Sequence, residues 1–491
     1  MERSPKRVYI KRLFMIGITA FGAYIPRARL NKRSIAEANS WFDASLNSLA
    51  KGERAICNWD EDTITMAVEA GRSCLASMQN KKPDALYMAS TTYPFIDRQN
   101  SVVVTEALNL QGKIETMDVA GSQRAASSAL ISLLARPEED NSLLVASEHR
   151  RSKAGSRSEM LWGDAAASIA IGSENVIAEF LASESMAVDF VDHYRGDDSS
   201  FDYDWEERWI RDEGFLKSVP QTVELVLEKA GLDAINVNHF ILPTDQARTP
   251  AAVAKKMGID PSVVVDNQIS QVGVAGAAQA ILLLAKVLES AKPGDNILLV
   301  GFGQGCDALL FKATDSITSA DGVVEAAIAG GREETNYNKF LSFNNLVERD
   351  IGKRGEADKQ TYLSGYNRRK NLLTNFVGGK CRECGTVQIP RDKYCVNPEC
   401  NALDSQDDYG FSDKSGKVAT WTADRLTFDW NPPAYFGMVE FEGGGKLMMD
   451  FTEVEQGKIN SGTPVTVHFR IKQFDPQRGF RKYFWKAIPL D

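Results

Sequence analysis

The stretch Asp118–Leu130, DVAGSQRAASSAL, has the pattern of a strand that ends in a tight turn and leads directly into a helix. A strand-like run covers residues 114–119, three small residues follow, and an alanine- and serine-rich helix then begins. Many enzymes place a nucleophile at such a helix start, because free backbone N–H groups there favour negative charge. The apex residue is Gln123, and a carboxamide is not a nucleophile. The segment therefore predicts the frame of a reaction site without its usual reacting atom.

Two segments of the chain repeat one pattern, NSLLVASEH at Asn141–His149 and DNILLVGFGQG at Asp295–Gly305. Each is a buried-type strand that follows an alanine- and leucine-rich helix and leads to a second strand of small residues. Alternation of strands and helices at this spacing predicts parallel α/β layers. The repetition predicts a duplicated unit, and chance similarity of two α/β segments stays open as the alternative. A chain of 491 residues also exceeds the length of one ordinary domain.

The character of the sequence changes after the second repeat. Residues 319–380 are polar, charged and compatible with connecting helices that could lie across a partner surface. After Gly410 the pattern alternates with period two and is interrupted by glycines, which predicts a small antiparallel barrel.

Four cysteines form two close pairs in CRECGTVQIPRDKYCVNPEC. Two pairs separated by a short turn provide the four thiolates that a closed tetrahedral Zn²⁺ site requires, with no open position for catalysis. Two disulfides or unrelated thiols are the alternatives. The scattered cysteines, of which Cys306 lies beside a glycine cluster, read as small core residues. The predicted ligands are Cys381, Cys384, Cys395 and Cys400, and the scattered cysteines are Cys57, Cys74 and Cys306.

Composition limits the function classes. Apolar residues make up 43% of the chain and charged residues 25%, which is typical of a soluble globular protein. The formal charge of −9 argues against a nucleic-acid partner, and no apolar run has the length of a membrane span. The basic start and short apolar run could form a signal peptide, but Gly17 and Gly22 interrupt the run and favour a strand at Phe14–Tyr24. Together with the cysteine pattern, this predicts a cytoplasmic protein.

Residues from about 16 to 313 resemble the thiolase superfamily, in the branch of 3-hydroxy-3-methylglutaryl-CoA synthase and ketoacyl synthase III. The segments that carry the resemblance are DEDTITMAVEA, MASTTYPF, DVAGSQRAASSAL, GDAAASIAIG, VDHYRGDDSSFDYDWEERWIRDEGF and LLVGFGQGCDALLF. Residues from about 336 onward resemble the zinc-ribbon plus OB-fold module that accompanies acyl-CoA thiolase-like proteins, through GGKCRECGTVQIPRDKYCVNPEC, PPAYFGMVEFEGGGKLMMDF and RGFRKYFWKAIP. The resemblance implies a duplicated, five-layered α/β fold followed by linking helices, a zinc ribbon and a small barrel.

The implied domains are a thiolase-like N-terminal half at 12–172, a thiolase-like C-terminal half at 173–315, a helical linker at 316–376, a zinc ribbon at 377–404 and an OB-fold barrel at 405–491. The resemblance further implies a CoA thioester as substrate, a structural zinc ion and a homodimer. It also admits a further thiolase-like or hydratase subunit as a partner.

The catalytic positions of the family hold other residues in this chain. Gln123 stands where the family has its acyl-accepting Cys, Val274 where it has an Asn, and Thr91 near the place of the general-acid Glu. The family His falls on the segment HFILPTDQA, at Ile241, Leu242 or Thr244 depending on the alignment. Formation of a thioester on this chain is therefore not expected.

The chemistry that survives is stabilisation of a thioester enolate by fixed hydrogen-bond donors. The amide and backbone N–H of Gln123 can donate, and the resemblance adds N–H groups around Gly301, Gly303 and Gly305 as the CoA-binding turn. Reactions that need only this stabilisation are retro-aldol cleavage of a 3-hydroxyacyl-CoA, the reverse aldol addition, and decarboxylation through the enolate.

Retro-aldol cleavage also needs a base for the hydroxyl proton. The candidates are Asp245, beside the vacated histidine position, and Tyr93, with Glu148 and His149 after the first repeated strand. Asp245 can equally cap a turn and Tyr93 can simply pack. Two rival functions remain open: a catalytically inactive acyl-CoA-binding scaffold that partners an active thiolase-like subunit, and a synthase or acyltransferase with an unrecognised nucleophile.

Overall fold

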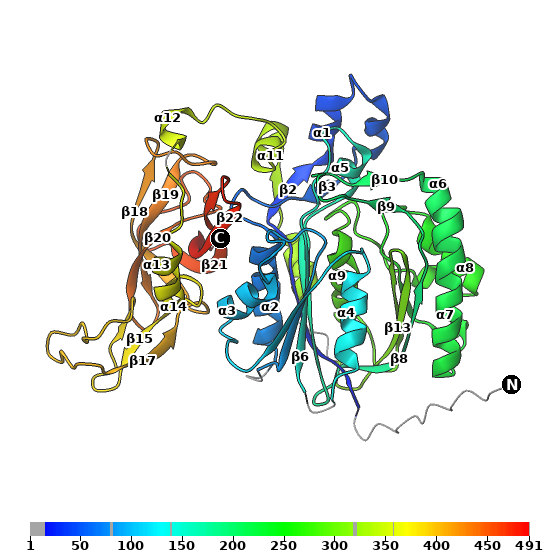
Figure 1. Ribbon diagram of the computed structural model, residues 1–491, viewed down its shortest axis with the longest axis horizontal. Coiled ribbons are helices and arrows are strands. Elements are labelled where there is room, and N and C mark those ends of the chain that lie inside the picture. The colour runs from blue at the N-terminus through cyan, green and yellow to red at the C-terminus, as the bar shows by residue number, and fades with distance from the viewer. Residues whose placement is uncertain (1–14, 79–81, 138–139, 318–321, 357, 491) are drawn as a thin grey trace.

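The computed structural model describes residues 15–78, 82–137, 140–317, 322–356 and 358–490 (Figure 1). A large α/β part occupies residues up to 317, and an all-β part occupies the C-terminal end. A segment of short helices connects the two parts. The strand expected from Phe14 begins at Gly17, and Phe14 itself lies outside the described residues.

A nine-stranded mixed sheet forms the α/β part, in the order β11-β12-β13-β8-β1-β7-β6-β4-β5. The pairs β4–β5, β4–β6 and β11–β12 are parallel, and the remaining neighbours are antiparallel. The bounds are β1 (Gly17–Tyr24), β4 (Ala85–Ala89), β5 (Glu115–Val119), β6 (Ser142–Glu148), β7 (Ala165–Gly172), β8 (Ala178–Ala187), β11 (His239–Ile241), β12 (Asn296–Phe302) and β13 (Gly305–Ala313).

The sheet repeats itself about the junction of β1 and β8. Outward from the junction, the first half runs β1-β7-β6-β4 and the second runs β8-β13-β12-β11, in matching chain order. A parallel bridge between Phe240 and Val264 stands where the first half has β5. The duplicated α/β pattern expected from the sequence is thus present in the topology.

Helices fill the space between the halves and cover both outer faces, which gives five layers (Figure 1). The central helices α4 and α9 touch each other and strands of both halves. Every residue of α9 except Lys286 is buried, as a helix enclosed on all sides requires. The bounds are α4 (Ala125–Leu134) and α9 (Gln279–Leu288) at the centre, α2 (Thr63–Ala76) and α3 (Asn100–Ala107) outside the first half, and α7 (Leu216–Ala230) and α8 (Thr249–Met257) outside the second.

Smaller elements surround this body. The described residues contain a three-stranded sheet, a short hairpin and several short helical segments. Around the α/β part they are β2 (Ala28–Asn31), α1 (Lys32–Asn39), η1 (Ala44–Leu49), β3 (Glu53–Ala55), α5 (Arg157–Leu161), β9 (His193–Tyr194), β10 (Tyr203–Asp204), α6 (Glu207–Trp209), η2 (Ile210–Phe215), η3 (Ala234–Asn236), η4 (Pro261–Val263) and η5 (Gly276–Ala278). The connecting segment carries α10 (Val323–Ala329), β14 (Arg332–Glu334), α11 (Tyr337–Phe343), α12 (Gly352–Gly355), α13 (Leu363–Arg368) and α14 (Lys370–Leu373).

Residues 377–489 form what we call the C-terminal β unit. A three-stranded sheet leads to an antiparallel five-stranded sheet of order β20-β19-β18-β21-β22. A bridge between Phe451 and Ala487 joins the end of β20 to β22 and closes this sheet, in agreement with the expected small antiparallel barrel. The bounds are β15 (Val377–Cys381), β16 (Val387–Gln388), β17 (Gln406–Gly410), β18 (Gly416–Asp424), β19 (Ala434–Phe441), β20 (Lys446–Asp450), β21 (Pro464–Asp475) and β22 (Phe480–Pro489).

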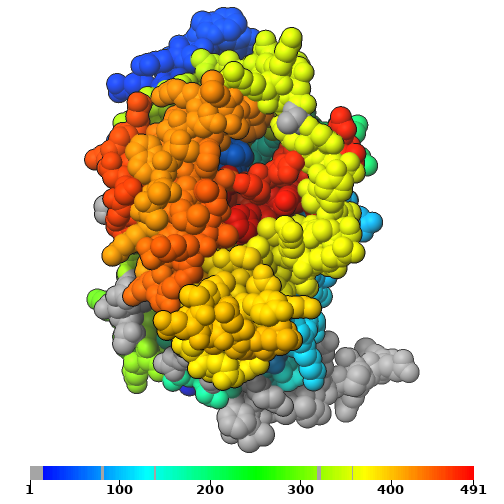
Figure 2. Space-filling view, turned by 90° about the vertical axis from the view of Figure 1, so that its left-hand side faces the viewer, coloured from blue at the N-terminus to red at the C-terminus, as the bar shows by residue number. Residues whose placement is uncertain are grey.

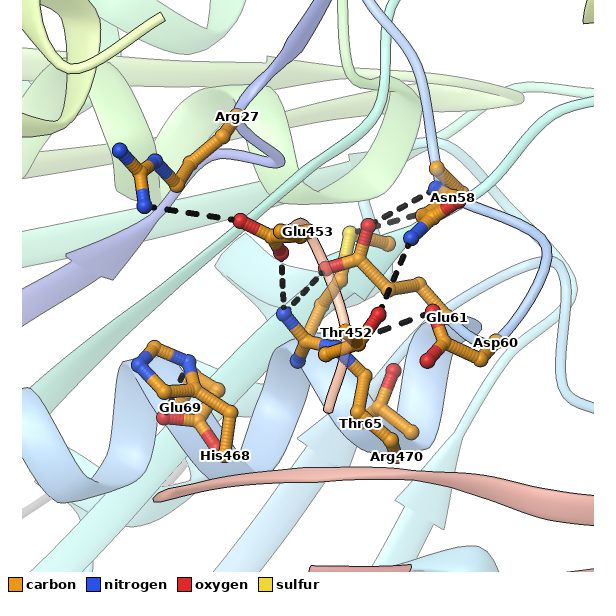
Figure 3. Close-up of polar contacts among 12 residues, drawn as sticks. Arg27, Asn58, Asp60, Glu61, Thr65, Glu69, Thr452, Glu453, His468 and Arg470 are labelled. Atoms are coloured by element: carbon orange, nitrogen blue, oxygen red, sulfur yellow. Dashed lines mark hydrogen bonds and ion pairs between the residues drawn. The ribbon is translucent and has the colours of Figure 1, made fainter. Parts of the chain in front are cut away.

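Buried charges hold the C-terminal β unit against α2 and the residues before it (Figure 3). Arg470 is fully buried, and its Nη2 lies 2.8 Å from Glu453 Oε1 and 3.1 Å from Glu61 Oε1. Lys486 reaches Asp60 with an Nζ–Oδ2 distance of 2.8 Å. We call the ionisable side chains on the two sides of this contact the interface cluster: Asp60, Glu61, Glu69, Glu453, His468, Arg470 and Lys486.

No helix among the described residues combines the length and the apolar character that crossing a membrane requires.

Candidate functional site

Asp307 on β13 fixes the start of α4. Its buried carboxylate accepts hydrogen bonds from Arg124 Nη1 at 2.8 Å, Ser127 Oγ at 2.8 Å and Ser128 Oγ at 2.6 Å. All three donors belong to the first turn of the helix or the residue before it. The apex residue Gln123 is therefore held at a defined place over the sheet.

A chain of polar side chains begins at Gln123. Its Nε2 lies 3.3 Å from Nε2 of His193, whose Nδ1 lies 2.9 Å from Asp192 Oδ2. Gln304, at the turn between β12 and β13, donates to Asp192 Oδ1 at 2.9 Å. A carboxylate at Nδ1 keeps the ring proton on that nitrogen and leaves the lone pair of a neutral imidazole on Nε2. The lone pair of His193 is thus directed to the Gln123 amide.

Glu148, the last residue of β6, supplies a carboxylate to the same place. It is fully buried and accepts from Thr91 N and Oγ1, each at 3.1 Å, and from Ala277 N at 3.0 Å. Thr91 is the residue near the position of the family's general-acid Glu. A carboxylate therefore reaches this position from the neighbouring strand.

Gly276 lies against both Glu148 and Gln123. A Cβ at Gly276 would lie 2.7 Å from Glu148 Cγ and 2.9 Å from Gln123 Oε1. Gln123 Oε1 is buried and has no hydrogen-bond partner among the described residues. The reaction cluster, as we call these residues, consists of Gln123, Glu148, Asp192, His193 and Gln304.

The three glycines predicted to bind CoA bring the β12–β13 turn close to the start of α4. A Cβ at Gly303 would lie 2.5 Å from Ser122 Oγ and 3.2 Å from the backbone N of Gln123. At Gly301 and Gly305 it would come within 2.1 and 2.0 Å of neighbouring atoms. The Gly303 N–H donates to Gly305 O at 3.0 Å within the turn. Close packing explains these glycines, and their role in CoA binding stays a prediction.

The two bases predicted from the sequence have other partners. Asp245 accepts from Trp162 Nε1 at 3.3 Å, and burial raises its pKa. The Tyr93 hydroxyl donates to Met88 O and accepts from Val119 N, and burial raises its pKa as well. Among the described residues the imidazole joined to Gln123 is that of His193. The catalytic roles of Asp245 and Tyr93 stay predictions.

His193 was not among the residues singled out from the sequence. It lies in VDHYRGDDSSFDYD, where no period of two or 3.6 points to a site. The one available signal was the pairing of Asp192 with His193, in a chain that has four histidines.

The scattered cysteines do not supply a nucleophile. Burial raises the pKa of Cys306 to about 12 and that of Cys74 to about 12, and it also raises the pKa of Cys57 well above its ordinary value. All three are buried and remain thiols at neutral pH.

A cavity of about 1320 Å³ lies between the α/β part and the C-terminal β unit. Figure 2 shows it as a hollow bounded by the connecting segment and the C-terminal strands. Thr91, Ala120 and Arg195 line it. Thr91 is hydrogen-bonded to Glu148, Ala120 belongs to the turn before α4, and Arg195 is two residues from His193 in the sequence. Gln123 and His193 are not among the residues that line the cavity. The aromatic lining residues include Trp59, Phe95, Phe428, Trp430 and Tyr435, and the cationic ones include Arg151, Arg481 and Lys486.

The four paired cysteines converge on one point. Their sulfur atoms lie within 4.8 Å of one another, with 3.9 Å between Cys381 and Cys400 and 3.5 Å between Cys384 and Cys395. A tetrahedron with Zn–S bonds of about 2.3 Å has edges of about 3.8 Å. All four cysteines are free thiols, and no disulfide joins any two of them in the structure. The donor set fits a four-thiolate metal site.

Known proteins resemble this chain over most of its length. Residues 227–312 match the family of the C-terminal part of 3-oxoacyl-[acyl-carrier-protein] synthase III. The hydroxymethylglutaryl-CoA synthase of Caldivirga maquilingensis is 30% identical over 353 residues, which cover 68% of this chain and 98% of the relative. That of Aeropyrum pernix is 30% identical over 313 residues, or 62% of this chain and 86% of the relative.

Two solved structures show the same fold. An HMG-CoA synthase complexed with CoA superimposes with a TM-score of 0.60 at 15% identity, over 71% of this chain and 95% of that structure. The 3-oxoacyl-(acyl carrier protein) synthase III of Pseudomonas aeruginosa gives a TM-score of 0.55 at 24% identity, over 62% of this chain and 99% of that structure.

Proposed function

The chain belongs to the hydroxymethylglutaryl-CoA synthase family, and from this premise we propose that it breaks or forms a carbon–carbon bond of an acyl-CoA thioester without an acyl-enzyme. The observation that carries the proposal is the Asp192–His193 pair, whose Nε2 lies 3.3 Å from the amide that replaces the nucleophile. An oriented imidazole beside a fixed donor can move a proton and stabilise an enolate in one step.

In the retro-aldol direction, His193 Nε2 accepts the proton of the 3-hydroxyl group of a 3-hydroxyacyl thioester. The C2–C3 bond breaks, the C3 oxygen becomes a carbonyl, and the electron pair moves into the thioester to give an enolate. The Gln123 amide and the backbone N–H groups at the start of α4 donate to the enolate oxygen. Protonation at C2 from the imidazolium releases the shortened acyl-CoA and an aldehyde or ketone. The aldol addition follows the same steps in reverse.

The imidazole favours this reaction over decarboxylation. Loss of CO₂ from a 2-carboxyacyl thioester leaves the enolate directly and needs no base for a hydroxyl proton. An Asp–His pair held by Gln304 adds nothing to that step, whereas it supplies the proton acceptor that retro-aldol cleavage requires.

The large cavity supports binding of an extended CoA ester. Its volume of about 1320 Å³ exceeds the usual range for small-ligand pockets, about 300–1,000 Å³. Arg151, Arg195 and Arg481 offer guanidinium groups suited to phosphates. Aromatic rings from both walls offer surfaces for the adenine and the acyl group.

We also propose a structural Zn²⁺ on Cys381, Cys384, Cys395 and Cys400, supported by their convergence. Four thiolates leave no open position, so the ion would stabilise the turn between β15 and β17 and take no part in catalysis. Elemental analysis of protein purified without chelator should show this metal. A Cys395→Ser variant should lose it and loosen the C-terminal β unit while the α/β part stays folded, and bound metal that is unchanged in Cys395→Ser would contradict the assignment.

A homodimer is the proposed assembly, to which a further thiolase-like or hydratase subunit could add. β5 is one of the two edge strands of the large sheet, and its Glu115 and Met117 are exposed. An open edge can pair with the same edge of a second copy about a two-fold axis. Light scattering at micromolar concentration should give twice the chain mass of 54.1 kDa, and a strictly monomeric mass would rule the dimer out.

The function is tested with purified protein and three classes of CoA ester: 3-hydroxyacyl, 3-oxoacyl and 2-carboxyacyl. Mass spectrometry should detect a shortened acyl-CoA and a carbonyl product from the first class. His193→Ala should lower this turnover by about 10²–10⁴-fold.

His239→Ala is the matched control, because His239 also pairs with a carboxylate, Asp295 at 3.0 Å, but on β11 away from the cavity lining. It should keep full turnover. An acyl adduct on the intact protein, or an unchanged rate in His193→Ala, would overturn the proposal. Absence of turnover with every class would leave the scaffold function in its place.

A further inference from the structure

A second group of metal-type ligands lies behind the cavity, apart from the four paired cysteines. Cys57 follows β3, His149 follows β6 and Asp164 precedes β7. A sulfur, a ring nitrogen and a carboxylate oxygen from these residues all lie within 4.8 Å of one another. Three segments distant in sequence therefore bring three different ligand types to one point.

The hydrogen bonds of this group are incomplete. Asp164 Oδ2 accepts from the backbone N–H of Cys57 at 2.7 Å and lies 3.0 Å from His149 Nδ1. His149 Nδ1 forms an ion pair with that oxygen, whereas the other carboxylate oxygen, Asp164 Oδ1, is buried without a hydrogen-bond partner among the described residues. An unmet buried polar atom is unfavourable by about 1–3 kcal/mol, so Asp164 Oδ1, beside a thiol and an imidazole, indicates a site that holds a further group.

Ligand chemistry selects the kind of group. Thiolate, imidazole and carboxylate together suit Zn²⁺ and similar transition-metal ions, whereas Mg²⁺ and Ca²⁺ prefer oxygen ligands alone. Burial and the carboxylates of Asp164, Glu61 and Asp62 raise the pKa of the Cys57 thiol. The negative field that disfavours the thiolate in the metal-free chain is one that attracts a dication.

Access to the site is from the cavity. Cys57 and Asp164 are 3% and 1% exposed, whereas His149 lines the cavity wall and its side chain is 23% exposed. Three protein ligands leave a fourth tetrahedral position for water or a ligand oxygen, as in catalytic zinc sites. This arrangement differs from the four-cysteine group, which is closed.

We propose that Cys57, His149 and Asp164 bind one divalent ion of the zinc type, with an open position toward the cavity. Binding replaces the thiol proton of Cys57, which passes to water, so that a thiolate, a neutral imidazole and a carboxylate surround the ion. The assignment does not depend on the proposed reaction, because binding is measured without turnover.

The full-length chain, purified without chelator, is analysed for zinc per protein. A Cys395→Ser variant disables the four-cysteine site and should still hold about one ion per chain. Adding His149→Ala or Cys57→Ser to that variant should remove it. The control is Cys395→Ser with His239→Ala, which changes a His that pairs with Asp295 elsewhere and should keep the ion.

Cobalt provides a second readout. Co²⁺ added to the metal-free Cys395→Ser chain should give a thiolate-to-metal absorption band, and this band should disappear in Cys395→Ser/Cys57→Ser. Circular dichroism checks that each variant keeps its α/β fold. A Cys395→Ser chain that is folded but holds no zinc and shows no cobalt band would overturn the proposal. Retention of the ion by the variants that lack His149 or Cys57 would overturn it as well.

Discussion

The interface cluster and the reaction cluster both bury several polar side chains, but they differ in what those side chains face. In the interface cluster, carboxylates face cations: Arg470 lies between Glu61 and Glu453, and Asp60 meets Lys486. In the reaction cluster, an imidazole lone pair faces an amide, and the amide oxygen of Gln123 has no partner among the described residues.

This difference indicates that the interface cluster stabilises the contact between the two parts, whereas the reaction cluster serves catalysis. Opposite charges that neutralise one another in a buried contact hold two surfaces together, and removal of one leaves the other exposed to a low dielectric. A polar group that is held by one neighbour and keeps an unused donor or acceptor can interact with a substrate. Changes in the first cluster should therefore alter stability, and changes in the second should alter turnover.

The largest effect is expected from Arg470→Met. The substitution removes the cation from among Glu61, Glu453 and Asp60, and the uncompensated buried carboxylates should lower the free energy of unfolding by about 3–5 kcal/mol. Denaturant unfolding measures the loss. Lys472→Met on the same strand is the control, because Lys472 is 40% exposed and its pair with Asp450 should contribute less than about 1 kcal/mol. Equal losses in the two variants would contradict the comparison.

Gln123→Ala should have the converse effect. Loss of one oriented donor typically reduces turnover by about 10²–10³-fold, equivalent to about 2.7–4 kcal/mol. The unfolding midpoint should stay at the wild-type value, because Asp307 still anchors the start of α4. Wild-type turnover in Gln123→Ala would reduce the apex amide to a packing role.

A smaller effect concerns the pH dependence of the interface cluster. Burial raises the pKa of Glu61 from 4.5 to about 7, against the opposing effect of Arg470. The folded chain then holds a proton on Glu61 between about pH 4.5 and 7 that the unfolded chain has lost. The stability contributed by this group is complete below pH 4.5 and disappears as the pH rises through 7, a change on the order of 1–3 kcal/mol.

Glu61→Gln isolates that contribution, because the amide does not titrate. Unfolding is measured at pH 5 and at pH 7.5 for both chains. The wild type should lose stability relative to Glu61→Gln between these two pH values. Neighbouring carboxylates with a lowered pKa, such as Asp60 and Glu69, titrate alike in both chains and therefore cancel in the comparison. A constant difference between the two chains would show that Glu61 is ionised throughout the range.

Local patterns predicted much of the α/β part and the place of the apex residue. The strand–turn–helix pattern located Gln123 at the start of α4, and the repeated segments corresponded to β6 and β12. Four cysteines at short spacing indicated their own convergence. In each case the interacting residues are close in sequence or share a periodic pattern, so the signal is local.

The remainder of the site depends on contacts between distant residues. His193 lies 70 positions from Gln123, in a hairpin that only the fold brings to the α4 turn. Tyr93 was predicted as a base, and its sequence position did not predict that its hydroxyl group would contact the backbone of Met88 and Val119. Asp60 and Lys486 are 426 positions apart, and nothing in either segment predicts their pairing.

The two walls of the cavity belong to one covalent chain, joined by the segment between β13 and β15. A tether of this kind holds its ends at an effective concentration on the order of a millimolar. A cavity shared by two separate subunits opens when dilution drives them apart. Here the second wall is present in a fixed ratio of one to one, at every protein concentration, so the binding affinity of the cavity should not depend on how dilute the protein becomes.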